Sequence, residues 1–125
     1  MSGAVARLLA RPGVVALSAA MVDDFVATGT CVLLFTGDAG RHPEIDDVAT
    51  ILPDLIRACG HAMRTGVIDP DADRASAARF GVTIRPTLVF LHDAAVLGAI
   101  PRMKDWAVYL NEIATIFAPL AQGVS

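Results

Sequence analysis

Hydrophobic residues follow two periodicities along this chain, and together they outline alternating strands and helices. The clearest strand signal is residues 30–35, a continuous apolar run with β-branched residues that predicts a central strand buried on both faces. Further strands are predicted at 14–17, 62–68, 87–92 and 95–100. A tight turn joins the last two, so they are expected to pair antiparallel.

Helical spacing dominates the segments between these strands. The longest predicted helix runs from Pro43 to Cys59, with Pro43 suited to its first turn and Pro53 predicted to kink it. Shorter helices are expected at 21–28 and 74–80, each closed by a glycine, and a last helix at 105–117. The apolar positions of the two long helices fall on single faces: Ile45, Val48, Ala49, Leu52, Leu55, Ile56 and Cys59 in the first, and Trp106, Leu110, Ile113 and Phe117 in the last.

The resulting order, β-α-β-α-β-α-β-β-α, predicts the fold class. A βαβ unit followed by a helix and a closing hairpin gives a central mixed sheet with helices on both faces. The chain has 125 residues, 54% of them hydrophobic, which suits one domain over residues 1–125. We therefore expect a single α/β domain whose element order resembles the thioredoxin-like fold.

Composition narrows the range of partners and compartments. The net charge of −3, with scattered basic residues, argues against nucleic acid. No apolar run reaches the roughly 20 residues needed to span a bilayer. Arg7 and Arg11 precede a short apolar stretch in loose imitation of a secretion signal, but Pro12 and Gly13 interrupt it and we expect a strand there. Two cysteines without framework spacing favour a reducing, cytoplasmic location.

The cysteines also bear on activity. Only Cys31 and Cys59 occur, and no Cys-x-x-Cys motif is present. Disulfide exchange requires a thiolate, and the paired cysteines of a thioredoxin are missing, so dithiol oxidoreductase activity is not expected. Cys31 lies in the apolar strand and Cys59 on the core face of a helix, which favours buried, unreactive thiols. We expect a protein that is not an enzyme; monothiol redox activity of Cys31 or Cys59 is the alternative.

Metal and cofactor sites are not expected. The three histidines are far apart in the sequence and fall in different loops. Asp69, Asp71 and Asp73 begin like a calcium-binding loop, but Arg74 replaces the required glycine and Phe80 the closing glutamate. We expect this segment to be a solvated turn, with Asp73 capping the helix that follows.

Residues 78–90, Ala-Arg-Phe-Gly-Val-Thr-Ile-Arg-Pro-Thr-Leu-Val-Phe, resemble the middle of a thioredoxin. A proline at the head of a central strand cannot donate a ladder hydrogen bond, so Pro86 belongs at the strand's start. In thioredoxin-like folds this proline is cis, and the residue before it offers backbone groups to an extended peptide. The resemblance implies a cis Arg85–Pro86 bond in a groove beside residues 37–42, and a peptide-binding edge formed by Arg85, Pro86 and Thr87.

Acidic residues cluster where a thioredoxin has its redox site. Asp38 lies in the loop before the long helix, and Glu44, Asp46 and Asp47 lie near the start of that helix. Carboxylates are stabilised at a helix N-terminus by the helix dipole, so one interpretation is a solvated helix start. The other is an acidic docking patch for a cationic ligand. The residues themselves leave both interpretations open.

Three parts of the chain together resemble the HyaE/HoxO/HupG family, which comprises thioredoxin-like hydrogenase-1 expression proteins without redox cysteines. The middle part is shared with ordinary thioredoxins, so the outer two are the more specific. The three parts are residues 32–38 continuing to 43–44 and 52–55, residues 79–82 with 85–90, and residues 98–106 with 109–110.

The resemblance implies a role in maturing an uptake nickel-iron hydrogenase. Proteins of this family are thought to be chaperones that engage the twin-arginine signal peptide of the small-subunit precursor before export. For this chain it implies a non-catalytic accessory protein without a cofactor, whose partner is that precursor. The proline edge would hold extended peptide, and the acidic rim would attract the arginines. A general interaction module bound near Trp106 is a further alternative, and a weak homodimer is left open.

Overall fold

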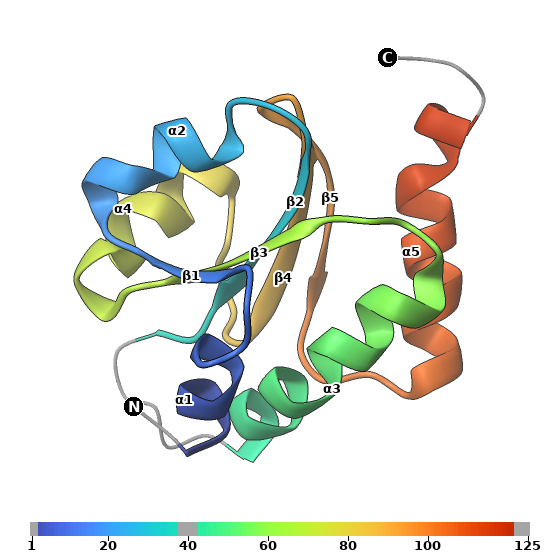
Figure 1. The fold of residues 1–125 in the computed structure, drawn as a ribbon, viewed down its shortest axis with the longest axis horizontal. Coiled ribbons are helices and arrows are strands. Elements are labelled where there is room, and N and C mark those ends of the chain that lie inside the picture. Colours follow the sequence, from blue (N-terminus) through green and yellow to red (C-terminus); the bar gives the residue numbers. More distant parts are fainter. Residues whose placement is uncertain (1–2, 38–42, 122–125) are drawn as a thin grey trace.

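A five-stranded sheet lies between two layers of helices (Figure 1). The computed structural model describes residues 3–37 and 43–121. In chain order the elements are α1 (Gly3–Leu9), β1 (Val14–Leu17), η1 (Ala19–Met21, a 3-10 turn), α2 (Val22–Val26), β2 (Thr30–Phe35), α3 (Pro43–Cys59), β3 (Arg64–Ile68), α4 (Pro70–Phe80), β4 (Thr87–His92), β5 (Ala95–Pro101) and α5 (Trp106–Ala121).

The strand order in the sheet is β1-β3-β2-β4-β5. β3 is parallel to β1 and β2, whereas β4 is antiparallel to β2 and β5. Parallel neighbours need a crossover connection, which the helices supply, while a hairpin suffices for β4 and β5. The hairpin turn places Asp93 and Ala94 at positive φ angles of 48° and 70°. The prediction of an α/β fold with a central mixed sheet is confirmed.

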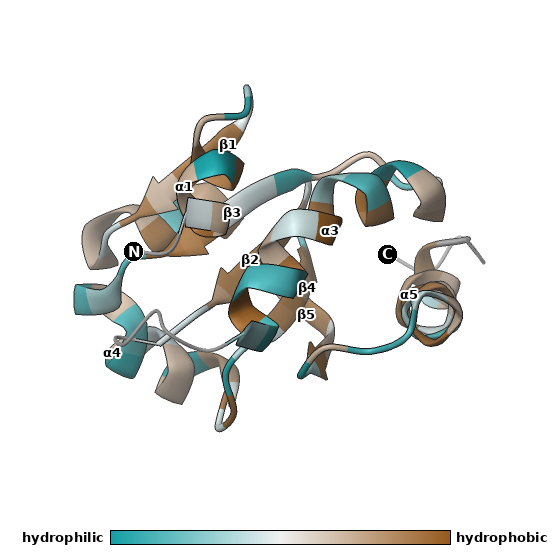
Figure 2. Ribbon diagram, turned by 90° about the horizontal axis from the view of Figure 1, so that it is seen from below, coloured by the Kyte–Doolittle hydropathy of each residue, from teal (hydrophilic) through white to brown (hydrophobic). Residues whose placement is uncertain are grey.

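Each face of the sheet has its own apolar core. Successive residues of a strand point to opposite faces, so Val32 and Leu34 of β2 pack with α1, α3 and α5. Cys31, Leu33 and Phe35 pack with α2 and α4 on the other face. All five side chains are fully buried. The strands in the middle of Figure 2 are accordingly hydrophobic, and the helices around them carry most of the hydrophilic segments.

The structure contains a helix, α1, that the hydrophobic pattern does not predict. It is only 7 residues long, and helices of this length are marginal in isolation. Its buried residues Ala4, Val5 and Leu8 belong to the same apolar core as Leu52 and Leu55 of α3. Packing against α3 therefore stabilises α1, and the local sequence carries little signal for it.

The predicted solvated turn at residues 69–73 is wrong. α4 begins at Pro70, directly after Asp69, which has extended backbone angles at the N-cap position. A proline in the first helical turn removes no helical hydrogen bond, so Pro70 starts the helix well. The Asp69 N–H donates to the carbonyl of Leu17 at 2.9 Å. Asp73 consequently lies inside the helix and is only 6% exposed, so it does not cap the helix.

The apolar face predicted for the last helix is only partly buried. Trp106 has the helical spacing of a core residue but is the first residue of α5, where the packed layer ends, and it is 43% exposed. Tyr109, Ile113 and Phe117 are buried. α5 continues through Pro119. None of the helices within residues 3–37 and 43–121 is long and apolar enough to cross a membrane.

Candidate functional site

The candidate peptide-binding residues that the structure describes lie at one end of the sheet. Phe35 at the end of β2 pairs with Thr87 at the start of β4, and Thr87 pairs with Pro101 at the end of β5. The segments that adjoin these strand ends are therefore neighbours, and the start of α3 joins them at the same end (Figure 1). We call this region the proline surface; it comprises Gly37, Glu44, Asp46, Asp47, Arg85, Pro86, Thr87 and Arg102.

The Arg85–Pro86 peptide bond is cis. Pro86 and Thr87 are buried, and the Thr87 hydroxyl donates to the Ile84 carbonyl at 2.6 Å. The Pro86 carbonyl accepts the N–H of Arg102 at 2.7 Å. In the described part of the chain, no group hydrogen-bonds to the backbone N–H or carbonyl of Arg85. Of the three predicted peptide-binding residues, Arg85 therefore has main-chain groups available to a ligand.

A carboxylate holds the Arg85 side chain in place. The Nε atom of Arg85 lies 3.1 Å from Oδ1 of Asp73, and Nη2 of Arg85 donates to the same oxygen. Oδ2 of Asp73 accepts the backbone N–H of Gly37 at 3.1 Å. The Asp73 side chain is 9% exposed, and that of Arg85 26%. Since a buried carboxylate requires hydrogen-bonding partners, Asp73 fixes both the residue before Pro86 and the turn after β2.

Gly37 permits the close approach of this turn to Arg85. Its φ angle is 73°, and a Cβ atom at this position would lie 3.2 Å from Cγ of Arg85. A larger residue would therefore combine an unfavourable backbone angle with a tight contact. Arg85 thus lies beside the first residue of the loop that the sequence predicted as its neighbour. Asp38, the next candidate site residue, lies outside the described residues.

Glu44 connects α3 to the loop after β5. Its carboxylate accepts two hydrogen bonds from the Arg102 guanidinium, 2.9 Å from Nε to Oε1 and 2.6 Å from Nη2 to Oε2. Oε1 also accepts the Met103 N–H at 3.0 Å. The hydrogen bond to Glu44 and its negative charge raise the pKa of Arg102. The Tyr109 hydroxyl donates to the Arg102 carbonyl at 2.9 Å. Glu44 therefore holds the loop after β5 against the start of α3.

Asp46 and Asp47 complete the acidic start of α3. Asp46 is half-buried, and its carboxylate oxygen Oδ1 is buried with no hydrogen-bond partner among the described residues. Its backbone carbonyl accepts the Thr50 hydroxyl at 2.8 Å. Asp47 is exposed. A buried carboxylate oxygen without a partner is unfavourable unless a ligand supplies one.

Sequence reasoning missed three residues that shape this surface: Asp73, Arg102 and Tyr109. Asp73 was detectable in part, because it adjoins Ala72 and is spaced i, i+3 and i+4 from Ser76 and Ala77, the buried face of α4. Its pairing with Arg85 spans 12 positions, and the Glu44–Arg102 pairing spans 58. No local periodicity reports contacts of that range.

The two cysteines differ in their surroundings, and both are free thiols. Cys31 is fully buried in β2. Burial raises its pKa, and the positive charge of Arg64 offsets this only in part. Cys59 is half-buried near the end of α3, with its Sγ 3.2 Å from the carbonyl of Ile56. A raised pKa leaves Cys31 a poor nucleophile.

We expect the native protein to leave insulin disulfides unreduced, in an assay with thioredoxin as the positive control. A thiol reagent should label Cys59 slowly and Cys31 only after unfolding, because the reactive species is an accessible thiolate. Peptide mapping of the labelled protein would assign the two sites. Insulin reduction well above the blank that is lost on Cys31→Ser or Cys59→Ser would instead support a monothiol activity.

Comparison with known proteins identifies the family of this chain. A sequence model described as Hydrogenase-1 expression protein HyaE matches residues 4–109. The chain belongs to the HyaE family. A hydrogenase expression/formation protein HupG from Bradyrhizobium diazoefficiens is 42% identical over 110 residues, which cover 84% of this chain and 74% of HupG. HoxO from Cupriavidus necator, a protein of the same description, is 42% identical over 95 residues, 74% of this chain and 59% of HoxO.

Solved structures agree with this assignment to the HyaE family. The crystal structure of a HupG from Rhodopseudomonas palustris is 36% identical, with a TM-score of 0.57, and covers 86% of this chain and 98% of its own. A mutant thioredoxin from Halobacterium salinarum has a TM-score of 0.67 at 19% identity, over 86% of this chain and 94% of its own. At that identity the second likeness shows the fold alone. The prediction of a thioredoxin-like fold is confirmed.

Proposed function

We propose that this protein is a non-catalytic accessory protein in hydrogenase expression and formation, and that it binds the twin-arginine signal peptide of a hydrogenase small-subunit precursor in the cytoplasm. The names of the HyaE-family relatives support the process. The binding mode rests on the proline surface. Its main-chain edge would hold extended peptide, and its carboxylates would bind the two arginines.

The main-chain groups of Arg85 support the binding of an extended peptide. Extended peptides bind such edges through main-chain hydrogen bonds, which are independent of the peptide's sequence. The Asp73 carboxylate keeps the Arg85 side chain folded back against Gly37, so the backbone of Arg85 keeps a fixed position. A rigid edge loses little conformational entropy on binding, which favours affinity.

The buried, unpartnered oxygen of Asp46 is the main support for binding of the signal peptide's arginines. A guanidinium is planar, permanently charged and suited to bidentate contact with a carboxylate. The Glu44–Arg102 pair, whose carboxylate lies two residues before Asp46 in α3, is an example of this geometry. A signal arginine would give Asp46 the partner that it lacks among the described residues, and exposed Asp47 would attract the second arginine.

Removing the charges of Asp46 and Asp47 should therefore weaken the binding of a synthetic signal peptide about tenfold. We estimate this from two ion pairs of about 0.7 kcal/mol each, which is typical of partly exposed pairs. The variant Asp46→Asn/Asp47→Asn preserves side-chain shape. Isothermal titration calorimetry should also show that binding weakens as salt is raised. Glu44 is left intact because its substitution would release the loop at Arg102.

A matched control removes two other neighbouring carboxylates, Asp23→Asn/Asp24→Asn, on exposed positions of α2. It lowers the negative charge equally and should change the affinity by less than about twofold, since distant surface charges are screened. The precursor itself provides the decisive comparison. Equal capture of precursor with and without its signal sequence would contradict the proposal and favour contact with the folded subunit.

A further inference from the structure

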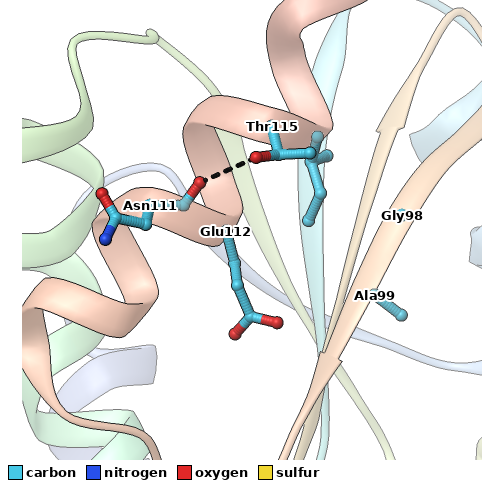
Figure 3. A pocket seen from close by; sticks show the side chains of 6 residues that line it. Gly98, Ala99, Asn111, Glu112 and Thr115 are labelled. Carbon is cyan, nitrogen blue, oxygen red and sulfur yellow. Dashed lines mark hydrogen bonds between the residues drawn. The ribbon is translucent and has the colours of Figure 1, made fainter.

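A pocket of about 300 Å³ lies between β5 and α5 and shares no lining residue with the proline surface. Figure 3 shows its two walls, the backbone of β5 on one side and one face of α5 on the other. The lining residues are Gly98 and Ala99 from β5, and Asn111, Glu112, Thr115 and Ile116 from α5.

An irregularity in β5 shapes the strand wall of this pocket. Phe90 of β4 pairs with Gly98, but the next residue, Leu91, pairs with Val96, so Leu97 is an extra residue. Such a β-bulge bends the strand that contains it. α5 approaches the strand closely at Gly98, where a Cβ atom would lie 2.8 Å from Cγ1 of Ile116. A side chain at position 98 would therefore force the Ile116 side chain to shift.

Glu112 gives the pocket its chemical character. It is the only charged residue in β5 and α5, and its side chain points into the space between them (Figure 3). Its Oε2 atom is buried and has no hydrogen-bond partner among the described residues. A carboxylate oxygen in this position is unfavourable unless a cation or donor completes it. A positively charged group that also donates hydrogen bonds would satisfy both requirements.

The strand beside the pocket offers a free edge. In the described sheet, β5 pairs with β4 alone. Edge strands of soluble proteins usually carry charged residues that prevent pairing with another chain. β5, of sequence Ala-Val-Leu-Gly-Ala-Ile-Pro, has none, and Val96 is 49% exposed. After the bulge at Leu97, residues 98–101 pair regularly with β4, and this uncharged part of the edge is a template for an added strand.

We propose that the β5–α5 pocket binds an arginine side chain of an extended partner segment, which pairs with the free edge of β5. Arginine fits better than lysine because its planar guanidinium forms two contacts with a carboxylate and is less strongly hydrated, so it enters a partly apolar pocket more readily. In the complex, the guanidinium would contact the Glu112 carboxylate, whose Oε2 has no partner among the described residues. The main-chain pairing supplies the affinity, and Glu112 supplies the selectivity.

This inference is independent of the proposed signal-peptide site, since the two surfaces share no residue. It also has a built-in reporter, because Tyr109 is the only tyrosine. Burial raises the pKa of Tyr109, a backbone hydrogen bond at Lys104 offsets part of this, and the negative charges of Glu112 and Glu44 raise it further. A guanidinium bound to Glu112 would offset one of these charges and lower the Tyr109 pKa. Arginine suits this titration because it stays charged throughout.

The test uses a capped pentapeptide, Thr-Val-Arg-Val-Thr, and the same peptide with uncharged citrulline in place of arginine. We expect the arginine peptide to shift the amide resonances of Gly98 and Ala99 and to lower the Tyr109 pKa. The citrulline peptide should bind at least about tenfold more weakly. Glu112→Gln should lower the affinity for the arginine peptide by a similar factor. Asp105→Asn, a matched loss of an exposed carboxylate, should change that affinity by less than about twofold.

Three results would overturn the inference. Equal affinity of the arginine and citrulline peptides would do so without any protein variant, so a folding defect in Glu112→Gln cannot obscure the outcome. Resonance shifts confined to residues 44–47 and 85–87 would assign the peptide to the proline surface. Binding of acetyl-arginine amide as tight as that of the pentapeptide would rule out pairing with β5.

Discussion

Replacing Asp73 by alanine should lower the free energy of unfolding by about 2–4 kcal/mol, because it leaves two partners without their acceptor. Arg85 loses its counter-charge at a position where its side chain is only 26% exposed, and the Gly37 N–H loses its carboxylate. Removing one member of a buried pair costs about 3–5 kcal/mol. We place this pair lower because solvent reaches part of Arg85. Urea denaturation of the variant and the parent protein would measure the difference.

Two controls make the Asp73 result specific. Asp54→Ala breaks the ion pair with Arg57. The two side chains, Asp54 and Arg57, are 62% and 65% exposed, so the free energy of unfolding should fall by only about 0–1 kcal/mol. The double variant Asp73→Ala/Arg85→Ala should be less destabilised than the sum of the single variants, because the two residues interact directly. A loss for Asp73→Ala no larger than that for Asp54→Ala would contradict the assigned role of the buried pair.

Replacing Tyr109 by alanine should be more destabilising still, by about 3–5 kcal/mol, the range for loss of a large buried aromatic ring. The side chain is fully buried against Ile113 and Phe117 in the core between the sheet and the helices. Its hydroxyl donates to the Arg102 carbonyl at 2.9 Å. Tyr109→Phe retains the ring and should cost only about 1 kcal/mol, the value of one hydrogen bond. The two variants thus separate packing from hydrogen bonding.

The Tyr109 variants also have a pH signature. Because the pKa of Tyr109 is raised in the folded protein, the neutral phenol favours folding. This contribution is fully present below the ordinary pKa of about 10 and is lost as pH rises through the raised value. Tyr109→Phe should remove that part of the alkaline loss of stability. Near-ultraviolet titration of tyrosinate would follow the group directly, since the chain has no other tyrosine.

Trp106→Ala is the matched control for Tyr109→Ala. Both positions hold a large aromatic residue in the first turn of α5, but Trp106 is 43% exposed and Tyr109 is fully buried. The tryptophan variant should lose less than about 1 kcal/mol, as expected for a surface substitution. A larger loss for Trp106→Ala than for Tyr109→Ala would contradict the observed packing of α5.

The apolar pattern predicted the sheet well because strand burial is a local property of the sequence. Residues 30–35 form β2 with the predicted bounds, and residues 87–92 form β4. Helix α3 likewise runs from Pro43 to Cys59 as predicted. In each case, a run of apolar residues or a single apolar face specifies an element that must be buried. Capping glycines and the tight hairpin turn then set the ends.

Polar residues in an apolar context were harder to interpret. The acidic segment at residues 69–73 resembles a solvated turn, yet it forms the first turn of α4 and buries Asp73. The preference of aspartate for solvent was overridden by the guanidinium of Arg85, which compensates the cost of desolvation. The partner follows 12 positions later. Only the packing of the loop before β4 against α4 brings the two together.

The fold class, the order of the strands along the chain, the absence of a cysteine pair and the family resemblance could all be read from the sequence, since each follows from local periodicity or from residues in a fixed order. Which carboxylates are available depends on the folded arrangement. Glu44 is bound to Arg102, 58 positions away, whereas Asp46 and Glu112 each keep a buried oxygen without a partner in the described residues. Charge is encoded in the sequence, but its compensation depends on which distant side chains the fold brings within hydrogen-bonding distance.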